Sequence, residues 1–454
     1  MMPLPKIRTV AVLVGSLAML GLAPSLVGQT TDPLGGFVTE ALRNNLSLEA
    51  ERLAERRSAA EVAEARGLFF PALTLDSRYS DQSGTLNLGD LLNPAFAALN
   101  QLRGTTDFPT NLDQTLPLAH ESRLRLVQPL FNEAIRKNYS LARNRFTGQE
   151  ARRIAAVRRL AADVQIAYLS LAAARSAAAV YESSLTLVVE NERVTERLLA
   201  AGRSTPDAVF RARAERSDVA QRLAEAREQV HAAARVLNQL LGRPLDTPVA
   251  AIPDSGLTFE LTIGEDSSVA HALAQREELA QIDAGIGAAN AAVGIATAAF
   301  LPSVSLAVDY GFQGQAVRFN RENDYWVASV VVSWNLFNGG RDAARRSAAR
   351  AEADRQRVTR RDVEERIRLE VRQAYQAAVV ARSGVATAED RVTAARRSFD
   401  LVRRRYEEGI ATQIEFLDAR THLTNAELNR TLTAHRYAIR FVDLERAAAL
   451  RTID

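Results

Sequence analysis

Proline placement restricts the possible folds of this chain more than any other feature of its sequence. All fourteen prolines lie at or before Pro302, and none lies between Pro129 and Pro206. Because proline breaks helix interiors, the segments 132–201 and 338–408 are each free to form one continuous helix. Each helix would be about 105 Å long at roughly 1.5 Å per residue, far longer than a helix of an ordinary globular protein.

Both segments repeat small or apolar residues at alternating spacings of four and three. This heptad spacing, held over many turns, predicts coiled-coil packing. The many alanines predict close approach of the helices, which would then build a wall or rod rather than a catalytic cleft. The repeating positions are Leu160, Val164, Ala167, Leu171, Ala174, Ala178, Tyr181, Leu185 and Val188 in the first segment, and Ile367, Val371, Ala374, Ala378, Ala381, Val385, Ala388, Val392, Ala395, Phe399, Val402 and Tyr406 in the second.

The chain contains two copies of one plan: a short helix, a strand, a loop, a strand, a very long helix, a turn and a long helix. Three motifs carry the match: Phe70-Pro71 with Leu301-Pro302, Leu130-Phe131-Asn132 with Leu336-Phe337-Asn338, and Gly202-x-x-Thr205 with Gly409-x-x-Thr412. The spacing of these motifs gives the first copy about 25 extra residues. They fall within the polar segment 81–119, whose glycines and prolines predict a loop.

The segments follow from this plan. We predict a signal peptide at 1–28; a first repeat at 33–243, with strands near 69–80 and 121–130 and long helices near 132–201 and 206–241; a linker at 244–264; and a second repeat at 265–452, with strands near 300–312 and 325–336 and long helices near 338–408 and 412–450.

The N-terminus has the pattern of a secretory signal. Lys6 and Arg8 precede an apolar run over 10–22, and small residues follow within 23–28. The run is too short to span a bilayer comfortably as an anchor. Since no later stretch has about 20 uninterrupted apolar residues, an exported membrane protein of this sequence must cross the bilayer as strands of a closed barrel.

The predicted strands alternate apolar residues with small or polar ones, as a strand with one apolar face does. Trp326 and Trp334 bracket the apolar side of the last strand and are about 26 Å apart in extended chain. That spacing suits an aromatic girdle at each membrane interface; an ordinary sheet with tryptophans at its strand ends is the alternative. Arg123 and Arg125 would face the barrel lumen, because exposure to lipid would be costly; a periplasmic location at the base of the strand is the alternative. Since a membrane barrel needs at least about eight strands, four strands per chain require an oligomer.

The two helix-to-helix turns have the local signals of a sharp reversal. Gly202 and Gly409 can adopt the left-handed conformation that ends a helix. Thr205 and Thr412 can cap the helix that follows, with Pro206 at a favoured first position after Thr205. Thr412 and Glu415 have capping-box spacing. Each long helix therefore reverses into an antiparallel partner.

Acidic residues follow both turns. Asp207, Glu415 and Asp418 lie in the first turns of a helix, where the helix dipole alone accounts for most acids. In a ring of subunits, the same acids would meet at one end and form a constriction that binds cations. Arg403–Arg405, just before the second turn, form either a solvated helix face or a latch to an acid on a neighbouring helix.

Composition argues against several other functions. The chain has no cysteine, and its five histidines are scattered without metal-ligand spacing. No Gly-x-Ser-x-Gly motif or nucleophile–base pair is evident. The formal net charge is only +3, which gives no electrostatic reason to expect nucleic-acid binding. We therefore expect no enzyme, no cofactor, no metal site and no nucleic-acid partner.

The duplicated plan, the Phe/Leu-Pro strand starts, the Leu-Phe-Asn strand ends and the turn Tyr406-x-x-Gly-x-x-Thr-x-x-Glu-x-Leu-Asp-Ala419 together resemble the TolC-like outer-membrane factors. The likeness covers essentially the whole mature chain. It implies a mainly α fold with a small β part: a homotrimer with a twelve-stranded barrel in the outer-membrane bilayer, four strands per subunit, and a long α-helical barrel in the periplasm. It further implies a periplasmic end that is closed at rest and opened by a periplasmic adaptor (membrane fusion) protein and an inner-membrane pump.

The resemblance also assigns residues. It carries gate positions over to Tyr406, Glu415 and Asp418, with Glu415 where aspartate is familiar. Ala411 stands where a basic gate residue is sometimes found. In the first turn Ala208 occupies the usual acidic position, and Asp207 lies one residue earlier as the gate candidate.

The tips Gly202, Thr205, Gly409 and Thr412 resemble those that contact the adaptor. We therefore predict a passive export duct of a tripartite efflux or type I secretion system. A soluble periplasmic coiled-coil adaptor or scaffold is the alternative.

Overall fold

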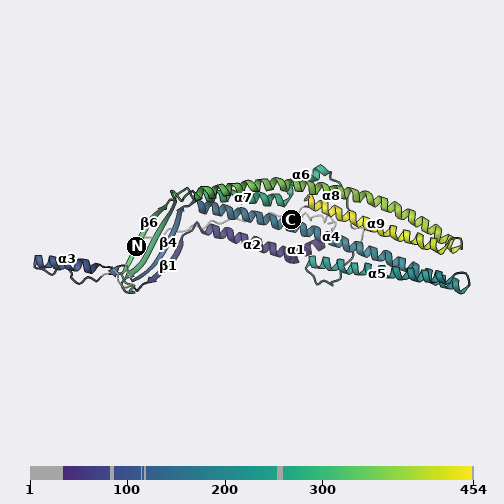
Figure 1. Cartoon of the computed structure of the whole chain (residues 1–454), viewed down its shortest axis with the longest axis horizontal. Helices are drawn as coiled ribbons and strands as arrows, with labels where there is room; N and C mark the ends of the chain where they lie inside the picture. Colours follow the sequence, from purple (N-terminus) through teal and green to yellow (C-terminus); the bar gives the residue numbers. More distant parts are fainter. Residues whose placement is uncertain (1–33, 82–85, 114, 117–118, 253–258, 452–454) are drawn as a thin grey trace, which may run out of the picture.

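A computed structural model describes residues 34–81, 86–113, 115–116, 119–252 and 259–451. The signal peptide predicted at 1–28 lies outside the described residues. The molecule is elongated, with long helices over most of its length, then a sheet, and the helix α3 beyond the sheet (Figure 1). Its two longest helices, α4 and α8, have 68 and 67 residues. They lie in the two proline-free segments 132–201 and 338–408.

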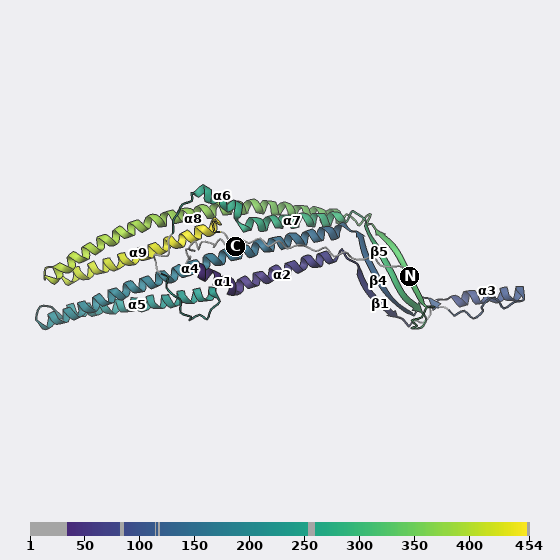
Figure 2. The same ribbon diagram turned by 180° about the vertical axis from the view of Figure 1, so that it is seen from behind.

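The helices and strands follow the predicted order of two copies. The first copy comprises α1 (Gly35–Asn44), α2 (Leu46–Gly67), β1 (Ala72–Tyr79), β2 (Leu86–Asn87), α3 (Leu88–Arg103), β3 (Thr115–Leu116), β4 (His120–Phe131), α4 (Glu133–Ala200) and α5 (Pro206–Leu241). The second comprises α6 (Glu265–Gln275), α7 (Glu277–Ala298), β5 (Ser303–Gly314), β6 (Asp324–Ser333), α8 (Arg341–Glu407) and α9 (Gln413–Ala447). The two copies run side by side (Figure 2).

Two predictions of local structure were wrong. Each copy begins with two helices rather than one short helix, because the chain becomes extended at Asn45 and at Arg276. The segment 81–119 is not simply a loop, since it contains α3. The Asn87 side chain caps α3 by accepting a hydrogen bond from the N–H of Gly89 at 2.8 Å, and Gly104 ends it in the left-handed conformation. Both capping residues lie in the segment 81–119, whose composition otherwise indicates a loop.

The heptad seams form the interior of the helical body. Every seam position predicted in α4 and α8 is buried or half-buried. Val164, Leu171, Val371 and Ala378 are completely buried. The helix α4 packs against α2, α5, α7 and α9, while α8 packs against α6, α7 and α9. The predicted coiled-coil packing is therefore confirmed.

One segment of the described chain, Glu265–Ala298, is long and apolar enough by composition to cross a membrane, with a mean hydropathy of 1.2. It consists of α6 and α7, which are separated at Arg276. The helix α7 lies against α4 and α8, and α6 lies against α8. The segment is therefore part of the helical body.

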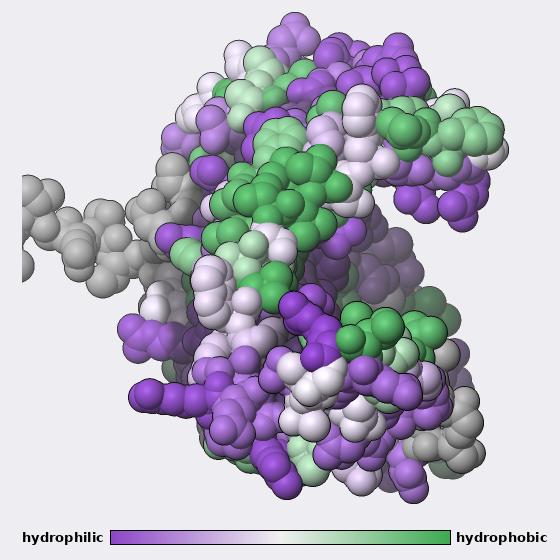
Figure 3. Space-filling view, turned by 90° about the vertical axis from the view of Figure 1, so that its left-hand side faces the viewer, coloured by the Kyte–Doolittle hydropathy of each residue, from purple (hydrophilic) through white to green (hydrophobic). Residues whose placement is uncertain are grey.

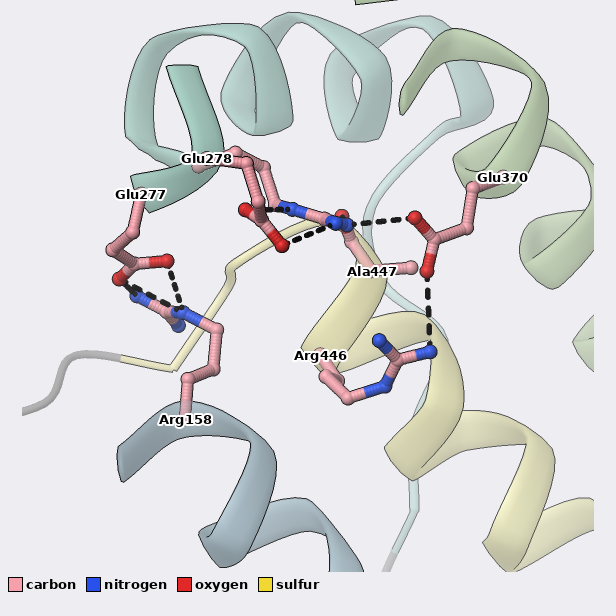
Figure 4. Close-up of polar contacts among 7 residues, drawn as sticks. Arg158, Glu277, Glu278, Glu370, Arg446 and Ala447 are labelled. Carbon is pink, nitrogen blue, oxygen red and sulfur yellow. Dashed lines mark hydrogen bonds and ion pairs between the residues drawn. The ribbon is translucent and has the colours of Figure 1, made fainter. Parts of the chain in front are cut away.

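Ion pairs between arginines and glutamates link α4, α7, α8 and α9 (Figure 4). Arg158 of α4 pairs with Glu277 of α7 at 2.7 Å. The buried Arg276 pairs with Glu278 at 2.8 Å and with Glu370 of α8 at 3.0 Å, and Arg446 of α9 pairs with Glu370 at 3.1 Å. Only the Arg158–Glu277 pair among these contacts joins the two copies. The others lie within the second copy, where carboxylates surround the buried guanidinium of Arg276, as a buried charge requires.

The four long strands form one antiparallel sheet in the order β1-β4-β5-β6. The two copies meet where β4 pairs with β5, with Leu124 opposite Tyr310 and Arg125 opposite Asp309. The strands β1 and β6 are the edges of this sheet.

Candidate functional site

The second helix-to-helix turn is held by its own side chains. Gly409 has a φ of 75° and ends α8. The hydroxyl of Thr412 accepts a hydrogen bond from the N–H of Glu415 at 3.3 Å, and the carboxylate of Glu415 accepts one from the N–H of Thr412 at 2.6 Å. This is the predicted capping box. The hydrogen bonds from the Thr412 backbone and hydroxyl lower the pKa of Glu415, so the carboxylate stays charged at the tip.

An aromatic cluster supports the same turn. Tyr406 stacks on Phe416 with ring centroids 4.9 Å apart, and Phe416 contacts Phe399 at 5.6 Å. Phe416 is only 7% exposed. Tyr406 therefore lies half-buried between α8 and α9, so in this structure its ring belongs to the packing of the hairpin.

Asp418 lies one turn beyond Glu415 and is exposed. Its carboxylate lies 3.5 Å from Nε2 of His422. Glu415, Asp418 and His422 line one groove between α8 and α9, with Arg391 among the α8 residues that complete it. His422 was only one of several scattered histidines in the sequence, although its spacing of four from Asp418 on a helix placed the two side chains together.

The first turn has the same backbone but different side-chain contacts. Gly202 has a φ of 67°, and Pro206 begins α5. Within the described residues, the side chain of Thr205 accepts no hydrogen bond from a helical N–H. Its side chain instead bonds the exposed carboxylate of Asp207, the main cause that lowers the pKa of this acid. Asp207 also pairs with Arg211.

Contacts between α5 and α9 join the two hairpins of one chain. At the tip, the side-chain amide of Gln413 donates a hydrogen bond to the carbonyl of Ala208 at 3.0 Å. Farther from the tip, Arg420 of α9 is 2% exposed and pairs with Glu215 of α5. Arg420 also donates to the hydroxyl of Ser184 on α4 at 2.7 Å. Sequence reasoning missed this link, because residues more than 200 positions apart leave no local signal of their contact.

The arginines before the second turn interact mainly within α8. Arg403 lies 3.4 Å from Asp400 and 4.0 Å from Glu407, and its guanidinium lies over the ring of Phe399. Arg405 contributes the electrostatic part of the lowered pKa of Glu415, after the Thr412 bonds. The latch to an acid on a neighbouring helix stays a prediction for this arginine run.

The sheet has two chemically distinct faces. On one face, Arg125 pairs with Asp309 at 2.9 Å and Arg123 lies 3.7 Å from Asp76. The other face is apolar and exposed, and hydrophobic side chains gather in patches beside hydrophilic ones at this end of the molecule (Figure 3). The exposed residues of the apolar face are Leu73, Leu75, Tyr79, Leu124, Tyr310, Trp326, Val330, Val332 and Trp334.

The two tryptophans occupy different positions. Trp326 pairs with Tyr310 inside the sheet. Trp334 lies one residue beyond the end of β6, and its indole N–H donates to the carbonyl of Phe300 at 3.1 Å. Trp334 therefore lies next to the junction of sheet and helices, and Trp326 lies toward the far end.

Known proteins share both the sequence pattern and this fold. Residues 37–243 and 269–450 match the family model of the outer membrane efflux protein. The chain belongs to the outer membrane efflux protein family. It is thus an outer-membrane efflux channel with a large periplasmic helical part, as predicted.

Relatives of this efflux protein match over most of their lengths. The cation efflux system protein CusC of Escherichia coli strain K12 is 26% identical over 406 residues, which cover 85% of this chain and 80% of CusC. The outer membrane efflux protein BepC of Brucella suis is 24% identical over 436 residues, covering 94% and 88%.

Solved structures of efflux channels share the fold. A structure of CusC superposes with a TM-score of 0.78 at 20% identity, covering 91% of each chain. The Campylobacter jejuni outer membrane channel CmeC gives 0.77 at 18% identity, covering 97% of this chain and 94% of CmeC. The predicted fold class, mainly α with a small β part of four strands in each chain, is confirmed.

Proposed function

We propose that three copies of this chain form a passive export duct whose periplasmic end is gated at the helix tips. The observation that carries the proposal is the sheet, with an exposed apolar face, a charged face and two edge strands. Three such sheets joined edge to edge make a twelve-stranded barrel with no free edge. The apolar face with Trp326 and Trp334 would then meet lipid, and Arg123 and Arg125 would line the water-filled interior.

The proposal covers the rest of the chain as well. Residues 1–28 are removed as a signal peptide, and 33–243 and 265–452 act as two repeats joined by 244–264. The turns that contain Gly202, Thr205, Gly409 and Thr412 contact a periplasmic adaptor, which couples the duct to an inner-membrane pump. The chain itself performs no catalysis and supplies only the path.

The gate is the second part of the proposal. Asp207, Tyr406, Glu415 and Asp418 lie at or within a few turns of the tips. The capping box fixes the charge of Glu415, and Asp418 projects from the same helix one turn later. Three copies of this pair, brought together at the axis, would form a ring of carboxylates that attracts cations and narrows the path.

The first test is the mass of the protein extracted in detergent from isolated outer membranes. A trimer is expected. A monomer or dimer recovered from the soluble periplasm would overturn the duct and favour an adaptor or scaffold instead.

The second test is conductance across planar bilayers in the presence of multivalent cations. The variant Glu415→Gln/Asp418→Asn should be blocked several-fold more weakly, because glutamine keeps the capping-box acceptor while both charges are lost. Glu182→Gln, an exposed acid of α4 far from the tips, is the matched control and should leave blockade unchanged. Equal blockade in all three proteins would show that Glu415 and Asp418 do not line the constriction.

A further inference from the structure

The helix α3 has no part in the gate or the helical wall. It belongs to the extra residues of the first copy, between β1 and β4, and lies beyond the sheet on the side opposite the long helices (Figures 1 and 2). Residues 86–113, called the finger below, comprise α3 and the chain that returns along it.

One face of α3 is covered by the finger itself. Asn93 exchanges two hydrogen bonds with the backbone of Leu112, at 2.9 and 2.8 Å. Asn100, seven residues later, exchanges two with the backbone of Phe108, at 2.7 and 3.0 Å. Between them, the ring of Phe96 stacks on that of Phe108 with centroids 5.6 Å apart. The finger is therefore an internally bonded unit with a defined inner side.

The opposite face of α3 is an exposed apolar stripe. Leu91, Ala95, Ala98 and Leu102 follow one another at spacings of four, three and four, the spacing of a coiled-coil seam. At about 100° per residue, they lie on the side of the helix away from Asn93, Phe96 and Asn100. Leu91 is 73% exposed and Leu102 is 84% exposed. Asp90 and Arg103 lie outside the stripe, which contains no charge.

We propose that this stripe packs against the same stripe of the two other copies of the chain, so that three fingers meet over the outer mouth of the duct. The proposal rests on the trimer proposed above. The finger lies in the part of the chain between β1 and β4, and β1 is an edge strand that would pair with a neighbouring copy when the proposed barrel closes. Three-fold symmetry then places all three fingers at the same end of one barrel, around one axis.

The residues of the stripe are suited to packing against the same residues of two other copies of the chain. Three-fold symmetry places the same residue of each copy at the same height along the axis. Leucines therefore pack against leucines, and alanines against alanines. The alanines at 95 and 98 allow close approach between the larger residues at 91 and 102. The helix continues along the length of the molecule beyond the sheet rather than folding back beside it (Figure 1). The helix α3 therefore lies beyond the strands that the proposed barrel places in the bilayer, which favours a neighbouring finger over lipid as the occupant of the stripe.

The experiment uses the absence of cysteine from the whole chain. Ala98→Cys places a single thiol on the stripe, and Ala97→Cys places one about 100° around the same helix. Both alanines are exposed, so neither change disturbs packing within the finger. Each variant is purified, checked for the trimer mass, placed in lipid nanodiscs with one trimer per disc, oxidised mildly and run on a denaturing gel without reductant.

The expected result is a strong disulfide-linked dimer band for Ala98→Cys and little for Ala97→Cys. Adding Leu102→Glu to Ala98→Cys should reduce the dimer yield several-fold, because three carboxylates at one level repel one another. Equal yields from the two single variants, or no dimer from an intact Ala98→Cys trimer, would overturn the contact.

Two further outcomes distinguish the causes of failure. An Ala98→Cys trimer that gives no dimer but whose thiol is shielded from a water-soluble maleimide by the bilayer would make lipid the occupant, which also overturns the contact. A protein that is not trimeric would overturn the proposed duct, and the finger contact with it.

Discussion

The two helix-to-helix turns share one backbone motif but are stabilised by different side chains. Both use a glycine with positive φ and a threonine before the next helix. In the second turn, the threonine and Glu415 cap each other over an aromatic cluster. In the first, Thr205 bonds Asp207 instead, and Pro206 starts the helix. Duplication thus preserved the shape of the turn, while the residues that stabilise it diverged.

The largest expected difference between the tips comes from the aromatic cluster. Phe416→Ala removes a buried ring between Tyr406 and Phe399 and should destabilise the second tip by about 3 kcal/mol. Val209→Ala is the corresponding change at a buried position of the first tip and should cost about 1 kcal/mol, because fewer buried carbons are lost. Amide hydrogen exchange at each tip measures the local effect. Equal changes in protection would mean that the cluster does not distinguish the two turns.

The next effect concerns the link between the hairpins. Arg420→Met leaves Glu215 without its buried partner and should cost about 2 kcal/mol, below the usual value for a fully buried pair because Glu215 keeps 26% side-chain exposure. Arg396→Met, which breaks the more exposed pair with Glu427, should cost less than about 1 kcal/mol. Thermal unfolding of both variants gives the comparison. If Glu215→Gln added to Arg420→Met produced a fully additive loss, the two side chains would not be coupled.

How much of this the sequence predicts depends on the range of each interaction. Proline positions and glycine–threonine turns act locally, so the long helices and both reversals could be predicted from the sequence. The finger could not, because its Asn93 and Asn100 bonds join a helix to a return segment that by composition looks like loop. The Arg420–Glu215 pair is formed only when two distant hairpins dock.

A smaller effect tests the caps themselves. Thr412→Ala should destabilise the start of α9 by about 1 kcal/mol, since it removes a helix-capping acceptor. Thr205→Ala should change the start of α5 by much less, because that side chain does not cap the helix. Exchange rates of the first-turn amides in α5 and α9 measure both. If Thr205→Ala reduced amide protection in α5 as much as Thr412→Ala reduced it in α9, the distinction between the two turns would be contradicted.

The smallest expected effect is the response of the second tip to acid. The pKa of Glu415 is lowered from 4.5 by its bonds to Thr412. Its contribution to the stability of the folded tip is therefore fully present above pH 4.5 and is lost as the pH falls through the lower, folded value. Exchange at the start of α9, corrected for intrinsic rates, should increase across that interval. Glu415→Gln should lack this increase, and an identical acid response in the variant would assign it to another group.

The order of strands in the sheet has a consequence for how the channel is made. The strands β1 and β6 are the edges of the sheet, and in the proposed trimer their outward backbone donors and acceptors would bond only to another chain. Barrel closure would then require association between subunits. Its rate would depend steeply on the concentration of secreted chains. In a chain secreted before its partners, the edge strands β1 and β6 must not pair with other proteins until the trimer assembles. Its half-life before assembly, rather than the stability of the finished channel, would therefore set how much protein the cell loses to aggregation and proteolysis.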